Sequence, residues 1–143
     1  SVFIDAAGGT IGDTQKVGVL LDASVAVNTG IQPVVTADGA LYFTSHKYVP
    51  PSLEFTLTME LEDGGVIAAE RVFLRSQVHR LIRLSATGTG SKAMAISLAG
   101  KYTAVGGYQN SNGNTTVQLS GSASYLTPLF FSFVITNALA TLP

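Results

Sequence analysis

The chain has 143 residues, of which 46% are hydrophobic and 12% charged. This length is that of one domain, residues 1–143, with a core large enough to fold without covalent staples. The absence of cysteine excludes a disulfide framework and a thiolate metal site. No apolar run is long enough to span a membrane, because the longest, residues 126–134, contains Thr127, Pro128 and Ser132.

The small number of charges predicts a subunit that hides surface in an assembly, although a lightly charged secreted domain would have the same composition. The charges are also unevenly distributed along the chain. Two bases against nine acids give −7 for residues 1–70, and six bases without an acid give +6 for residues 71–143. Either acidic and basic strands lie side by side in one domain, or the acidic side of one copy meets the basic side of the next.

The N-terminal part predicts a loop, a long strand and two further loops. Residues 1–15, which include the glycine-rich stretch DAAGGTIGD, are expected to form a flexible arm or loop. Residues 17–28 predict a strand that is interrupted by a bulge near Asp22. Residues 29–38 and 45–52 are expected to be loops, separated by a strand at 40–44. Pro50 and Pro51 would prevent a ladder from continuing, so the next strand is expected to start after them.

The clearest pattern in the chain is the alternation of residues 53–62, LEFTLTMELE. Every odd position is apolar and every even position is polar, which is typical of an antiparallel strand with one buried and one wet face. The wet face carries the carboxylates Glu54, Glu60 and Glu62. A pair such as Glu60 and Glu62 could act in glycoside hydrolysis, but a solvated or interfacial strand face is the simpler interpretation.

Residues 66–77 predict the only helix, with Val66, Ala69 and Phe73 on its buried side. Arg71 and Arg75 are four positions apart and are expected to face outward. Residues 78–85 can then be read as a strand, in which Arg80 and Arg83 would lie on different faces. If the helix instead continues to Leu84, Arg71, Arg75 and Arg83 could form one patch.

The remaining sequence predicts strands at 93–99, 101–105, 115–120 and 125–142. In the last of these, alternate apolar residues from Leu129 to Ile135 are expected to face the strand at 53–62 across the core. The predicted fold class is therefore mainly β, with two packed antiparallel sheets as a sandwich or partly open barrel and one short flanking α-helix.

No motif predicts catalysis, a metal or a cofactor. The segment GTGSK at 88–92 lacks the order and the following helix of a phosphate-binding loop. His46 and His79 have no cysteine or second histidine at metal-ligand spacing. We therefore expect a protein that is not an enzyme.

Three segments in the second half together resemble the tail-tube, or major tail, proteins of long-tailed bacteriophages. They are AAERVFLRSQVHRLIRLSATG at 68–88, AISLAGKYTAVGGYQNSNGNTTVQLSG at 95–121 and the ending LFFSFVITNALATLP at 129–143. The resemblance implies packed antiparallel sheets with a flanking helix. It also implies six copies joined edge to edge in a ring, and rings stacked into a tube through which DNA passes without specific binding.

This resemblance gives the candidate residues expected roles in a virion tail that is assembled in the host bacterial cytoplasm. Glu54, Glu60 and Glu62 would face the lumen and repel DNA phosphates. The loops at 29–38 or 45–52 would reach the next ring. The candidate contacts between subunits are Arg71, Arg75, Arg80, Arg83, Pro50 and Pro51, and the other partners would be further virion tail proteins.

Two other classes stay open from the sequence. One is a capsid decoration or fibre β-sandwich, or a pilus-like subunit that exchanges a terminal strand. The other is a carbohydrate-binding or hydrolytic β-domain, which the absence of tryptophan disfavours.

Overall fold

The computed structural model describes residues 1–34, 45–61, 65–111 and 113–137, and within them eleven strands and one helix. The strands are β1 (Val2–Ala6), β2 (Gln15–Lys16), β3 (Leu20–Asn28), β4 (Ile31–Val34), β5 (Ser45–Tyr48), β6 (Ser52–Glu60), β7 (Arg80–Thr87), β8 (Ala93–Val105), β9 (Gln109–Ser111), β10 (Asn114–Ala123) and β11 (Phe131–Thr136), and the helix is α1 (Val66–Ser76). The strand predicted at 40–44 lies outside the described residues.

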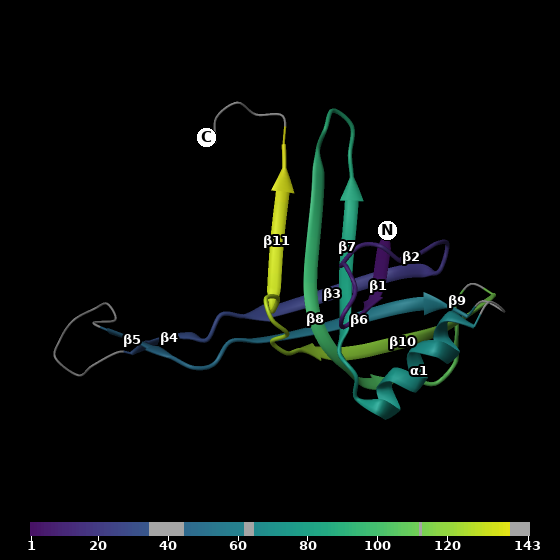
Figure 1. The fold of residues 1–143 in the computed structure, drawn as a ribbon, viewed down its shortest axis with the longest axis horizontal. Coiled ribbons are helices and arrows are strands. Elements are labelled where there is room, and N and C mark those ends of the chain that lie inside the picture. Colours follow the sequence, from purple (N-terminus) through teal and green to yellow (C-terminus); the bar gives the residue numbers. More distant parts are fainter. Residues whose placement is uncertain (35–44, 62–64, 112, 138–143) are drawn as a thin grey trace.

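Nine of these strands form one antiparallel sheet that folds over on itself. Its order is β2-β1-β7-β8-β10-β6-β3, with β11 added to β8 and β9 to β10. The fold occurs along β8, whose residues 93–100 pair with β7 and β11 and whose residues 100–105 pair with β10. We call β1, β2, β7, β11 and the first part of β8 the first layer, and β3, β6 and β10 the second layer; their strands cross in Figure 1.

The core lies between these two layers. The odd positions of β6 from Leu53 to Met59 are buried, as the alternation predicted. Their neighbours on β10 are Val117 and Leu119, and the opposite wall comes from β1, β7 and β8. The buried residues of that wall are Val2, Ile4, Ile82 and Leu98, and Tyr102 lies on the part of β8 that pairs with β10.

The mainly β fold with one short helix is confirmed, and the large sheet is not closed into a barrel. The bulge predicted near Asp22 is also present, as a register shift between Leu20 and Asp22. The segments predicted as loops at 29–38 and 45–52 instead contain β4 and β5, which pair as a separate two-stranded hairpin. No helix among the described residues is long and apolar enough to cross a membrane.

The N-terminal segment predicted as an arm or loop contains a core strand. Val2 and Ile4 of β1 are buried, and the strand pairs with β7 over its whole length. The loop that follows is tied back by Asp5, which is 4% exposed. Its carboxylate accepts hydrogen bonds from the backbone N–H groups of Gly12 at 2.8 Å and Thr14 at 2.7 Å.

Helix α1 forms where it was predicted but turns a different side to the sheet. Its buried residues are Ile67 and Glu70, with Phe73 packed beside the core, whereas Ala69 is exposed. The sequence pattern missed this side because it contains a carboxylate, which is rarely buried unless it is paired.

Strand β11 does not face β6 across the core in the way that its sequence pattern predicted. Phe131 packs against the core, but Phe133 is 49% exposed and Ile135 is 61% exposed. The reason is the place of β11 in the sheet, because it pairs with the first part of β8 and extends beyond the second layer (Figure 1).

Candidate functional site

The outward side of the second layer is a polar surface built from three neighbouring strands. Glu54 and Glu60 lie on this side of β6, as predicted, with Glu54 exposed and Glu60 half-buried. They are six positions apart, which places them about 20 Å from each other along the strand. Glu62, the third predicted carboxylate, lies outside the described residues.

The neighbouring strands add small polar groups and two further charges to this surface. Asp22 of β3 lies opposite Thr58, which gives a third carboxylate that the sequence pattern did not single out. Ser122 of β10 lies opposite both Glu54 and Lys101, so a lysine lies two strands away from Glu54. Among the described residues of β3, β6 and β10 there is no basic side chain, and the surface is weakly acidic.

Arg80, predicted to contact another subunit, instead belongs to a buried polar cluster within the chain. Its guanidinium donates two hydrogen bonds to the Glu70 carboxylate, from Nη2 at 2.9 Å and from Nε at 3.1 Å. Both side chains are almost fully buried, and the guanidinium lies 4.0 Å from the centre of the Phe73 ring. Arg80 is therefore not available to a neighbouring copy.

Tyr102 completes this cluster from β8. Its hydroxyl donates to Glu70 Oε2 at 3.0 Å, and its ring meets Phe55 edge to face at 6.1 Å between centroids. Burial raises the pKa of the Tyr102 hydroxyl, and the adjacent Glu70 carboxylate raises it further. The hydroxyl therefore stays protonated and acts as a fixed donor, and the cluster joins α1 to both layers.

The other three arginines of the predicted set lie nearer the surface. Arg83 is half-buried and its Nε donates to Ser97 Oγ at 3.1 Å, on the face of β7 opposite to Arg80. Arg71 bonds the Tyr108 hydroxyl at 3.0 Å and lies over its ring. Arg75 lies exposed in the last turn of α1. The structure thus separates these arginines instead of gathering them into one patch.

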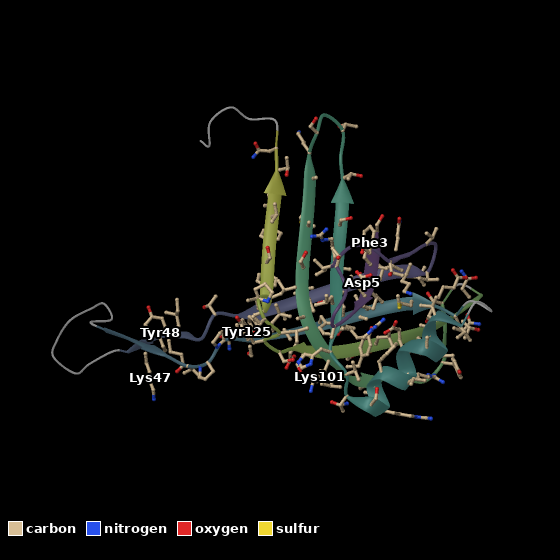
Figure 2. The ribbon with its side chains drawn as sticks, viewed as in Figure 1. Phe3, Asp5, Lys47, Tyr48, Lys101 and Tyr125 are labelled. Atoms are coloured by element: carbon tan, nitrogen blue, oxygen red, sulfur yellow. The ribbon has the colours of Figure 1, made fainter. Side chains whose placement is uncertain are left out.

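The hairpin β4–β5 projects from the body of the molecule (Figure 1), and Lys47 and Tyr48 lie on it far from the core (Figure 2). Its base is closed by a hydrogen bond from Val49 N–H to Gly30 O at 2.8 Å. Gly30 has φ +73°, and a side chain there would collide with the Val49 carbonyl, so this position requires glycine. Pro50 and Pro51 follow, both exposed, and β6 starts directly after them, as predicted.

The described residues hold no group of three or more histidine or acidic side chains that could bind a metal. Two of the cavities are apolar depressions at the surface. One, of about 360 Å³, lies at the ends of β7, β8 and β11, and another, of about 290 Å³, lies between Leu81 and the segment 126–129. Neither of these two cavities is lined by a carboxylate or a histidine.

The sequence matches no known family model, and a search of curated proteins finds no similar sequence. Solved structures are similar in fold. A chain in the "Virion of native gene transfer agent (GTA) particle" has a TM-score of 0.57 and 12% sequence identity. A chain in the "Tail of empty GTA particle", computed with C6 symmetry, has a TM-score of 0.59 and 12% identity.

Each of these two alignments covers 93% of the present chain and 95% of the other chain. The likeness therefore extends over nearly the whole of both chains, including both layers of the sheet. At 12% identity it establishes a shared fold.

Proposed function

We propose that this chain is a structural subunit of a phage-like tail and that its copies form stacked hexameric rings of a tube through which DNA passes. The observation that carries the proposal is the shared fold over 93% of the chain with a subunit from a C6-symmetric tail. The role proposed here is structural and not enzymatic.

Two edge strands of the folded sheet, β3 and β11, support ring formation. β3 ends the strand order on one side, and β11 lies outside the main path on β8. Exposed strand edges bind further strands unless they are blocked, so the edges of successive copies are natural contact points. A contact between two different edges is heterologous and closes into a ring when the rotation per copy is suitable.

In this arrangement the polar surface of the second layer lines the lumen. Its three described carboxylates, Asp22, Glu54 and Glu60, repel phosphates. They outnumber Lys101, the lysine that lies two strands away from Glu54. The weak acidity would let DNA move through without specific binding. The projecting hairpin β4–β5 would contact the next ring of the stack, with Pro50 and Pro51 stiffening its base.

A pilus-like exchange of the N-terminal strand is disfavoured by the position of β1. Its side chains Val2 and Ile4 fill the core of their own chain, and β7 already pairs with the strand. An exchanged strand would leave this part of the core empty, so the N-terminal segment serves folding within the chain.

Negative-stain electron microscopy of the purified chain over a concentration series tests the proposal. Hollow rings or tubes with six-fold class averages are expected at high concentration. Particles that stay monomeric at all concentrations would contradict it.

A further inference from the structure

The first layer carries an uncovered apolar surface where it extends beyond the second layer. We call its residues Met94, Ile96, Phe133 and Ile135 the overhang. Phe133 lies opposite Ile96, and Ile135 lies opposite Met94, so all four share one face of the sheet. This is also the face on which Leu98 and Phe131 pack into the core. Yet Met94, Phe133 and Ile135 are 39%, 49% and 61% exposed.

The overhang rises next to the free edge of the second layer. β3 is the last strand in the sheet order and, among the described residues, pairs within the chain only with β6. Between its side chains Leu20, Ala23 and Val25 and the overhang lies a cavity of about 250 Å³, lined also by Leu84 and Ala86. Figure 1 shows β7, β8 and β11 continuing past β3. One more strand added to β3 would therefore lie directly against the overhang.

We infer that a strand from a second copy of this chain occupies this position, hydrogen-bonded to the edge of β3 and packed on the overhang. The inference rests on the proposed function and identifies the surface that joins neighbours in a ring. One occupant then explains both the free edge of β3 and the exposed overhang. The added strand makes hydrogen bonds to the free backbone groups of β3 and covers Met94, Phe133 and Ile135.

The chemistry of the surface favours an uncharged, apolar strand as the occupant. The cavity lining contains no ionisable side chain, and its one charged group is the terminal amino group of Ser1. β3 itself contributes only Asp22, on the opposite face. An edge of nine residues with one charge and no proline lacks the usual protection against strand addition. Nucleic acid requires several cationic contacts, and the only cation of this lining is the Ser1 amino group, which donates to the Ser85 carbonyl oxygen at 2.8 Å.

The area available explains why the occupant would be a copy held in a closed ring. The exposed parts of the overhang amount to roughly 300 Å², the size of a large apolar patch on a monomer. A stable pair of proteins needs about 800 Å² from each partner. Contact at the overhang alone is therefore too small to hold two copies together. It has to be supplemented by backbone pairing along β3 and by ring closure, in which every copy is held by two neighbours. Assembly is then expected to depend steeply on concentration.

Substitutions at two neighbouring residues of β11 distinguish the effect of the overhang from that of the opposite face of the strand. Ile135→Asp places a carboxylate on the overhang, whereas Val134→Asp places the same carboxylate on the opposite face, where Val134 is 53% exposed. Because both side chains are exposed in the single chain, both variants should fold, which circular dichroism of the monomers checks. Ile135→Asp should raise the concentration needed for assembly about 100-fold, since it buries an unpaired charge. Val134→Asp should change it by less than about threefold.

Hydrogen exchange of wild-type monomers and assemblies gives a second measurement. The outer amides of β3 should exchange quickly in the monomer and be slowed at least about 100-fold in the assembly. If rings form but β3 is not protected, or if Ile135→Asp assembles as readily as wild type, the inference is wrong while the proposed function stands. If wild type stays monomeric, both are wrong.

Discussion

Replacing Glu70 by glutamine is expected to destabilise the chain severely, although it changes one atom of the side chain. Glu70 is 1% exposed and accepts three hydrogen bonds, two from Arg80 and one from Tyr102. Glutamine removes the negative charge and leaves the 6% exposed Arg80 guanidinium without a counter-ion. Breaking a buried pair in this way costs about 3–5 kcal/mol. A domain of ordinary stability has about 5–15 kcal/mol in total.

The assay is urea denaturation of the monomer followed by circular dichroism, at a concentration below assembly. Glu70→Gln should lower the urea midpoint without changing the slope, and should lower Tm by roughly 10 °C or more. Glu54→Gln, an exposed carboxylate-to-amide control, should stay within about 0.5 kcal/mol of wild type.

The double variant Glu70→Leu with Arg80→Met separates the charge from the packing. It removes both ions and keeps apolar volume, but it leaves the Tyr102 hydroxyl without its acceptor, which costs about 1–3 kcal/mol. The double variant should therefore recover part of the loss and lie within about 1–3 kcal/mol of wild type. A loss below about 1 kcal/mol for Glu70→Gln, or a double variant as unstable as the single one, would refute the reasoning.

Three further substitutions have expected outcomes. Burial tends to raise the pKa of Asp5, but hydrogen bonds from Thr14 and Gly12 outweigh this effect and lower the pKa. The ionised Asp5 carboxylate therefore stabilises the fold in full above about pH 4. This stabilisation is lost as the pH falls through the lowered pKa. Asp5→Asn should therefore cost about 1–2 kcal/mol at neutral pH and weaken the acid dependence of the free energy of unfolding; an unchanged dependence would contradict this. Gly121→Ala should cost about 1–3 kcal/mol in denaturation, because its Cβ would collide with the Phe55 ring and lie 2.5 Å from the Lys101 carbonyl, whereas Gly107→Ala meets nothing. Glu54→Lys should leave tubes intact but make them co-sediment with DNA at low salt; loss of assembly would instead place Glu54 at a subunit contact.

The period-two pattern predicted the strands well because it records burial directly. In β6, odd residues from Leu53 to Met59 are buried as the alternation required, and the bulge near Asp22 follows from the change of phase in β3. What the pattern cannot tell is whether an apolar face is covered by the same chain. Phe133 and Ile135 show the dry alternation of a core strand, yet they are exposed because β11 extends beyond the second layer.

The polar cluster was missed for a different reason. Glu70 and Arg80 are ten positions apart, and each looks like a surface residue when only its own helix or strand is considered. Their burial depends on how α1 packs on β8, which is a tertiary property. One signal in the sequence could have indicated the cluster. Ile67 is apolar and lies three positions before Glu70, so the two side chains share one side of the helix, and burial of Ile67 places the Glu70 carboxylate on the inner side.

The most direct test of the account is an electron cryo-microscopy reconstruction of the assembled wild-type chain. The account predicts a hollow six-fold tube in which Glu54 and the outward side of β3, β6 and β10 face the channel. A channel lined by β7, β8 and β11, or an assembly without a channel, would contradict it.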